Sequence, residues 1–260
     1  MTALGFYEHR ESAVHRLNPM TKLVLSITTI IAAFAISLPW WPAALFVVIL
    51  LPAVLASGTQ GRYLNLLLKF FLPLLIVIFL IQGLFFPGDG TILAQLGPLT
   101  VKSAGLVFAA RTSLRLLVLI GAFLFLLLTT HPGTLMGAMT QHGMAPNISY
   151  VVSATLQIIP TFRARAQNIL QAQRARGLET KGSLRRRVRA LLPLVGPLIL
   201  GSLTDVEERS VAMEARAFGS PAKRTSLVVI PDTTAQRIAR WGLWAFAAAT
   251  LAVNALGVVR

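Results

Sequence analysis

The stretch "LLLKFFLPLLIVIFLIQGLFF", residues 66–86, decides the class of this fold. Its only charged side chain is Lys69, which stands near one end, where a long ammonium side chain can reach the membrane interface. About 20 apolar residues in a helix are enough to cross the hydrocarbon core of a bilayer. The run therefore predicts a membrane-spanning helix.

The rest of the chain shares this apolar character. Of its 260 residues, 55% are hydrophobic and only 13% are charged, and the mean hydropathy is +0.70. These values exceed what a domain with an aqueous surface carries. The chain has no cysteine, so it has neither disulfides nor thiolate metal ligands. Residues 1–19 are charged and lack an apolar h-region, so we predict no cleavable signal peptide.

Four further apolar runs predict helices in the membrane. The first two are short and meet at "PWWP" (39–42), where tryptophans suit an interface. In the third, Arg111 and Arg115 lie four residues apart on one helical face, which predicts contact with protein or headgroups rather than with lipid chains. With residues 66–86 they make about five transmembrane helices; the four runs are residues 23–38, 43–56, 105–130 and 241–259.

The distribution of basic residues predicts how the chain is oriented. There are 24 Lys and Arg, and 13 of them lie between Arg163 and Arg224, whereas the loop 87–100 has none. Cytoplasmic loops are enriched in Lys and Arg. We therefore predict a multi-pass protein whose N-terminus is inside, whose basic segment is cytoplasmic and whose C-terminus is outside. No aromatic residues are interleaved with this charge, so we predict no nucleic-acid partner.

The apolar runs and the charge divide the chain into three segments. Residues 1–130 form a membrane domain of four helices, residues 131–235 a cytoplasmic coupling-helix domain, and residues 236–260 a C-terminal transmembrane helix. Residues 148–160 and 190–203 are apolar but too short to span, so we predict that they lie along or under the membrane. Both continue into amphipathic patterns, which predict two long helices. The predicted fold class is therefore an all-α membrane protein.

Two polar motifs echo one another at the ends of these long helices: "AQRARGLETKG" (172–182) and "AMEARAFGSPAKR" (212–224). One interpretation is an ordinary helix end, with Gly177 as one stop and Gly219 followed by Pro221 as the other. The other is a docking tip, because small neighbours leave one guanidinium free to enter a groove on a partner and bind carbonyls or a carboxylate. The two interpretations weigh about equally. The candidate docking residues are Arg176, Arg216, Ala175, Gly177, Ala215 and Ala217.

Other chemistries find little support in the sequence. "GLETKGS" (177–183) has Ser183 where a phosphate-binding loop needs lysine. The four histidines have no paired carboxylates nearby, and the three aspartates are scattered. We predict no catalytic residue, no metal site and no cofactor bound by this chain.

Three stretches resemble one protein family over nearly the whole chain. "SAVHRLNPMTKL" (12–23) is similar to the opening Ser-x-x-His-Arg-Leu-Asp-Pro-x-Thr-Lys-Leu of the transmembrane T component of energy-coupling factor (ECF) transporters, with Asn18 replacing Asp. "TTHPGTLMGAM" (129–139) resembles its Thr-Thr-x-Pro-x-x-Leu segment. "AQRARG" and "EARAFG" resemble its two Ala-Arg-Gly motifs, with Ala217 replacing the second glycine.

This resemblance implies a subunit of a bacterial importer of vitamins or of cobalt or nickel, in the cytoplasmic (inner) membrane. It implies that Arg176 and Arg216 dock on two ABC ATPase subunits, which bind ATP and Mg themselves. It also implies that the membrane part and the apolar faces of the long helices hold a membrane-embedded substrate-binding S component. On this basis the expected S-component contacts are Phe162, Ile169, Val195, Ile199, Leu203 and Val206.

Two alternatives remain. A conventional ABC importer permease that holds its own substrate is expected to carry one Glu-Ala-Ala-type coupling loop and polar groups along its spans, whereas this chain has two coupling motifs and few polar residues in its spans. An integral membrane enzyme is less favoured, because no catalytic cluster is visible. The cargo stays open, although length and a fifth span favour a module shared by several vitamin-binding subunits.

Overall fold

The computed structural model describes residues 12–87, 91–96, 99–178, 184–218, 220 and 229–256. The contacts group the chain into two compact units. The membrane unit comprises Met1–Met144 and Ile230–Arg260, and the helix-pair unit comprises Ala145–Val229. The chain therefore leaves the membrane unit once and returns to it once.

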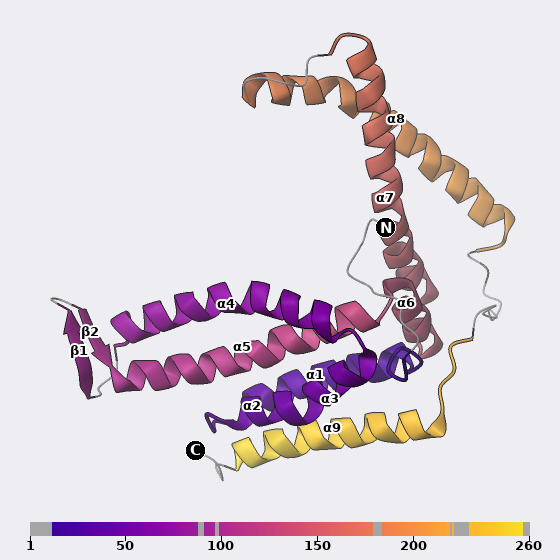
Figure 1. The fold of residues 1–260 in the computed structure, drawn as a ribbon. Helices are drawn as coiled ribbons and strands as arrows, with labels where there is room; N and C mark the ends of the chain where they lie inside the picture. Colours follow the sequence, from indigo (N-terminus) through magenta and orange to yellow (C-terminus); the bar gives the residue numbers. More distant parts are fainter. Residues whose placement is uncertain are drawn as a thin grey trace. The chain divides into compact units, whose positions relative to one another are not determined.

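The membrane unit is helical apart from one hairpin within the described residues. Helix α1 contacts α5 and α9, and α4 contacts α5, so that these long helices lie side by side (Figure 1). Strands β1 and β2 pair antiparallel in the predicted outside loop, with Gln95 opposite Thr100. The elements are α1 (Pro19–Ala35), α2 (Trp41–Leu45), η1 (Phe46–Leu50), α3 (Leu51–Ser57), α4 (Gln60–Phe85), β1 (Ile92–Leu96), β2 (Leu99–Lys102), α5 (Ser103–Thr129), α6 (Pro132–Gln141) and α9 (Thr234–Ala255).

Helices α4 and α5 are long and apolar enough to cross a membrane, with 26 and 27 residues. The helices 19–35 and 41–57 are apolar but shorter, as their sequences predict. In its most apolar stretch, α4 buries only 6% of its residues within the chain, which leaves most of its surface for lipid or a partner. The prediction of an all-α membrane protein is confirmed, with the small hairpin as an addition that the sequence did not indicate; five crossings remain a prediction.

The run 43–56 is not a uniform helix. Its middle turn, η1, is a π-helix, in which the N–H of Leu51 donates to the carbonyl of Phe46 five residues earlier. Pro52 follows directly and has no N–H to give to the helical ladder. Because Pro52 lacks this donor, a regular α-helical turn is unfavourable at this point. For one turn the backbone hydrogen bonds therefore span five residues instead of four.

Close packing of α4 against α5 depends on glycines. A Cβ on Gly105 would lie 2.3 Å from the carbonyl oxygen of Gln82, and a Cβ on Gly121 would lie 2.6 Å from the hydroxyl oxygen of Tyr63. Both distances are shorter than any non-bonded contact allows. The two helices can therefore approach this closely only because these positions have no side chain.

Arg115 contacts protein, as its position on the helix predicts. Its guanidinium donates to the carbonyl oxygen of Ile36 over 3.1 Å and lies 5.7 Å from the centre of the Phe34 ring. Ile36 directly follows the last residue of α1, so Arg115 caps the negative end of that helix.

The helix-pair unit consists of α7 (Pro146–Ala175) and α8 (Leu184–Ala215), which contact each other. Each of the two short apolar segments predicted from the sequence merges with its amphipathic continuation into one long helix. Pro160 lies inside α7, and Pro193 and Pro197 lie inside α8. Internal prolines bend a helix without ending it when the surroundings hold it, and α8 changes direction along its length in Figure 1.

The predicted cytoplasmic segment begins at residue 131, whereas the helix-pair unit begins at Ala145. The difference is α6, which packs against α1 and so belongs to the membrane unit. The C-terminal helix α9 also packs against α1. The chain thus joins its first and last helices in one unit.

Candidate functional site: the two arginine-bearing helix ends

Helix α7 ends in a compact reversal of the chain. Gly177 has a φ of 93°, in the left-handed region, and its N–H donates to the carbonyl of Arg174 over 3.0 Å. The N–H of Leu178 reaches back to the carbonyl of Gln173 over 3.0 Å. These two bonds satisfy carbonyls that the end of a helix otherwise leaves without partners.

Helix α8 ends in the same way forty residues later. Ala217 has a φ of 54°, its N–H donates to Glu214 over 2.9 Å, and the N–H of Phe218 donates to Met213 over 2.9 Å. The repeated sequence is therefore a repeated helix-ending motif, in which the residue after the arginine takes the left-handed conformation. Glycine adopts that conformation freely and alanine does so at a cost of about 1 kcal/mol.

The second predicted helix stop was wrong. The end of the second long helix was predicted at Gly219 followed by Pro221, both of which lie outside the described residues. The helix already ends at Ala215, because Ala217 turns the chain. No local pattern indicated this end, since alanine is normally a helix-forming residue.

All six candidate docking residues are exposed. Arg176 and Arg216 each stand where the chain turns, with residues of minimal size on both sides: Ala175, Gly177, Ala215 and Ala217. Within the part of the chain that the structure describes, no hydrogen bond or ion pair is recorded for either guanidinium. Both ends thus present a cation on a surface without bulky neighbours.

A salt bridge holds α7 against α8. Arg165 donates from Nη2 to Oδ1 of Asp205 over 3.0 Å, and its Nη1 lies 2.8 Å from Oδ2, so the pair is bidentate. This hydrogen bonding lowers the pKa of the Asp205 carboxyl and raises that of Arg165. The guanidinium lies over Gly201, where a Cβ would be 3.0 Å from Nη1. A side chain at this position would therefore push the guanidinium away by a few tenths of an ångström.

The salt bridge divides the two helices at equivalent points. Arg165 precedes Arg176 by eleven residues, and Asp205 precedes Arg216 by eleven residues. At about 1.5 Å per residue, each arm from the salt bridge to its arginine is roughly 16 Å long. The helix-pair unit therefore has two arms of equal length whose ends share one helix-ending motif.

The six expected S-component contacts lie on the same two helices, and none is fully buried. Phe162 and Val206 line a small cavity of about 90 Å³ beside the salt bridge. Three of the expected contacts precede Val206 on α8 and are 48%, 53% and 55% exposed: Val195, Ile199 and Leu203. Further apolar residues of this unit are exposed although they were not among the expected contacts, including Ile148, Val151, Ile158, Ile159, Leu192, Leu200 and Val211.

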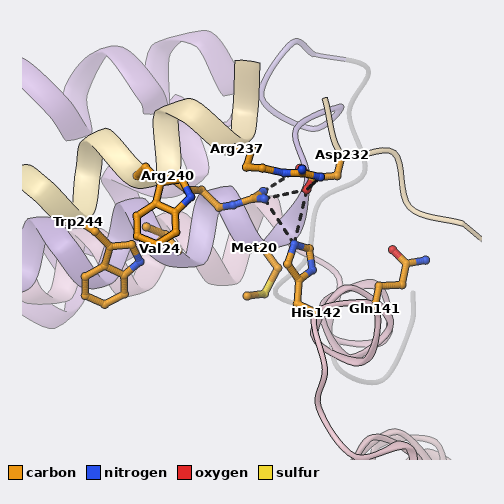
Figure 2. Close-up of a pocket in the computed structure, with 9 residues that line it drawn as sticks. Met20, Val24, Gln141, His142, Asp232, Arg237, Arg240 and Trp244 are labelled. Carbon is orange, nitrogen blue, oxygen red and sulfur yellow. Dashed lines mark hydrogen bonds and ion pairs between the residues drawn. The ribbon is translucent and has the colours of Figure 1, made fainter. Parts of the chain in front are cut away.

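A second polar cluster lies in the membrane unit (Figure 2). Arg240 donates to Oδ1 and Oδ2 of Asp232 over 2.8 and 2.7 Å, and to the hydroxyl of Thr21 over 3.2 Å. Nε2 of His142 lies 3.5 Å from Oδ2 of Asp232. This proximity was not predicted from the sequence, because Asp232 is distant from His142 in the chain. These two residues stand close to the points where the chain leaves the membrane unit and returns to it.

The "NPMTKL" stretch connects three helices at this end of the unit. The backbone N–H of Asn18 donates to Gln236 over 2.9 Å, and Lys22 donates to the last carbonyl of α5, that of Thr129, over 2.8 Å. The Asn18 side chain accepts from Met20 and donates to the carbonyl of Pro231. An aspartate carboxylate has no hydrogen to donate, so the Asn18 departure from the family pattern adds a bond to the segment before α9.

No group of three or more His, Cys, Asp or Glu side chains that could hold a metal ion occurs among the described residues.

The comparison with protein families identifies the chain. The family described as cobalt transport protein, CbiQ, matches residues 10–227. This chain belongs to that family.

Curated relatives agree with the family over most of the length. The energy-coupling factor transporter transmembrane protein EcfT of Listeria innocua is 31% identical over 233 residues, 85% of this chain and 86% of that protein. EcfT of Heliobacterium modesticaldum is 32% identical and covers 86% of each chain. A putative ABC transporter ATP-binding protein of Bifidobacterium longum is 32% identical over 82% of this chain, which corresponds to 28% of that longer protein. The resemblance stated from the motifs is thus confirmed.

Proposed function

We propose that this chain is the energy-coupling transmembrane subunit of an ECF-type ABC importer. It transmits the ATP-driven movement of two ATPase subunits to a separate substrate-binding S component. The observation that carries this proposal is the pair of equal arms, each of which ends in an exposed arginine on the same left-handed helix end. Two equivalent ends suit a partner with two equivalent grooves.

The docking chemistry follows from the arginine. A guanidinium forms two parallel charge-assisted bonds to a carboxylate, and such bonds contribute about 1.5–3 kcal/mol each. The neighbours of each arginine are small and leave room for the wall of a groove. They are Ala175 and Gly177 beside Arg176, and Ala215 and Ala217 beside Arg216. ATP and Mg bind to the partner subunits, and this chain itself catalyses no reaction.

The bidentate pair of Arg165 and Asp205 gives the movement a fixed point. When the ATPases close, the two tips approach each other, and each helix pivots about the salt bridge. The S component, seated on the apolar side chains of α7 and α8, then tilts and releases its cargo inward. The cargo class is a vitamin or a transition-metal ion.

The relatives support the choice of partners. Those named EcfT are called transmembrane proteins of energy-coupling factor transporters. In the Bifidobacterium longum protein, a segment similar to this chain belongs to a longer polypeptide that is named for ATP binding. That arrangement is expected if the segment works directly with an ATPase.

The first experiment tests the tips. The double variant Arg176→Ala, Arg216→Ala, coexpressed with the ATPase subunits and the S component, should insert in the membrane but lose co-purification of the ATPases and lose uptake. The control is Arg163→Ala, which removes an exposed arginine from the body of α7. Unchanged uptake in the tip variant would refute the proposal.

A second experiment separates the two partners. The double variant Ile199→Glu, Leu203→Glu places charges on the exposed apolar face of α8 and should release the S component while the ATPases still co-purify. Loss of both partners together would mean that the helix itself is damaged. Retention of both would exclude this face as the S-component surface.

The orientation is tested by cysteine labelling, which is straightforward because the natural chain has no cysteine. We propose that the N-terminus is inside and the C-terminus outside. Thr91→Cys, in the exposed hairpin segment, should react with a membrane-impermeant maleimide in intact cells. Ala172→Cys, on exposed α7, should react only after the membrane is opened.

A further inference from the structure

A groove of about 780 Å³ opens in the membrane unit between α1, α6 and the start of α9 (Figure 2). One end is polar and holds Asp232, His142 and Arg237. The other end is apolar and is lined by Val24 of α1 and by Trp241 and Trp244 of α9. The groove therefore joins a charged surface to an apolar one within a single cavity.

The polar end carries an excess positive charge. The Asp232 carboxylate is engaged by both nitrogens of Arg240, so that these two charges cancel. Arg237 contributes a further cation: its side chain is 65% exposed, and its Nη2 lies 3.9 Å from the same, already engaged oxygen Oδ2. Arg237 thus retains most of its capacity to bind an anion.

The apolar end continues directly from this cation. Arg237, Trp241 and Trp244 follow one another at intervals of four and three residues, which places them on one face of α9. Trp241 is 72% exposed and Trp244 is 44% exposed. Tryptophan concentrates at the headgroup level of membranes. From Arg237 to Trp244 the helix rises roughly 10 Å, about the depth from a phosphate to the upper acyl chain.

We propose that this groove binds one anionic phospholipid. The phosphate pairs with the guanidinium of Arg237, and an acyl chain lies along Val24 and the two indole rings. A soluble anion would leave the apolar end wet, and an apolar peptide would leave Arg237 without a counter-charge. Basic pockets between transmembrane helices are a recognised way of holding anionic headgroups. Which leaflet of the membrane supplies the lipid depends on the orientation proposed above, whereas the binding of a lipid does not.

The test is native mass spectrometry of the full-length purified protein, titrated with phosphatidylglycerol and with phosphatidylcholine. We expect one phosphatidylglycerol to be retained at least tenfold more tightly than phosphatidylcholine. Arg237→Gln should abolish this preference, and Trp244→Ala should weaken both lipids. Arg163→Gln, on α7 and not among the residues that line the groove, is the matched control and should bind like the parent protein. Monodisperse elution of every variant establishes that it is folded.

Several outcomes would overturn the proposal. One is equal retention of phosphatidylglycerol by the parent protein and Arg237→Gln. Another is tight binding of glycerol 3-phosphate without an acyl chain, which would assign the groove to a soluble phosphate. Because neither the ATPases nor the S component is present in this assay, a negative result leaves the coupling function standing. Failure of the tip variants likewise leaves the lipid site standing.

Discussion

Arg240 binds Asp232 through two hydrogen bonds of 2.8 and 2.7 Å, just after the chain has returned to the membrane unit at Ile230. The same carboxylate lies 3.5 Å from His142, just before the chain leaves that unit after Met144. The outgoing and returning segments therefore meet at one carboxylate.

Removing this carboxylate should destabilise the membrane unit. Asp232→Asn leaves the guanidinium of Arg240, only 10% exposed, without its anion. A buried charge that loses its partner costs about 2 kcal/mol or more. We expect a melting temperature several degrees lower in a fluorescence thermal melt in detergent, and unchanged melting would show that the pair is not structural.

The same pair predicts the response to acid. Hydrogen bonds from Arg240, together with the charges of His142 and Arg237, hold the pKa of the Asp232 carboxyl below its ordinary value of about 4. The folded state therefore resists protonation more than the unfolded state does. The stabilisation is complete above about pH 4 and is lost as the pH falls through the lowered pKa. Melting temperatures between pH 7 and 3 should fall less steeply at the acid end in Asp232→Asn than in the parent protein.

The left-handed helix ends make opposite predictions for their two residues. Ala217→Gly removes a strained alanine and should stabilise the end of α8, whereas Gly177→Ala introduces the same strain into α7, each by about 1 kcal/mol. Amide hydrogen exchange should become slower at Phe218 in the first variant and faster at Leu178 in the second. The same direction of change at both ends would contradict the repeated motif.

Helix packing in the membrane unit is tested at glycines. Gly105→Ala should force α4 and α5 apart, because its Cβ would lie 2.3 Å from a backbone oxygen, and overpacking of this kind costs about 1–3 kcal/mol. Gly83→Ala is the control, since its Cβ would make an ordinary contact of 3.5 Å with Leu106. We expect a lowered melting temperature in the first variant and little change in the second.

The salt bridge between the arms is tested by reversal of its charges. Arg165→Asp and Asp205→Arg, each alone, place like charges opposite one another and should reduce uptake. The double variant restores an oppositely charged pair and should recover a substantial part of the uptake. Absence of any recovery would mean that the two side chains act separately rather than through their mutual contact.

Much of the fold could be predicted from local patterns. Runs such as residues 66–86 predict helices in a membrane because their length and composition leave no other stable solution in lipid. The position of Arg115 on its helix correctly predicted contact with protein. The repeated arginines marked the ends of α7 and α8, although the stop at Ala217 was missed, since a left-handed alanine has no sequence signal.

Pairings between distant residues were beyond the reach of the sequence. Nothing local indicated that Asp232 would meet His142, or that α6 and α9 would both pack on α1, because long-range packing depends on shape and burial rather than on periodicity. The apolar runs, the basic segment and the two Ala-Arg motifs were determined by the sequence itself, through hydropathy, charge and helix periodicity. Only the tertiary structure gave the arms equal lengths about Arg165 and Asp205 and fastened α9 to α1, because both depend on contacts across the chain.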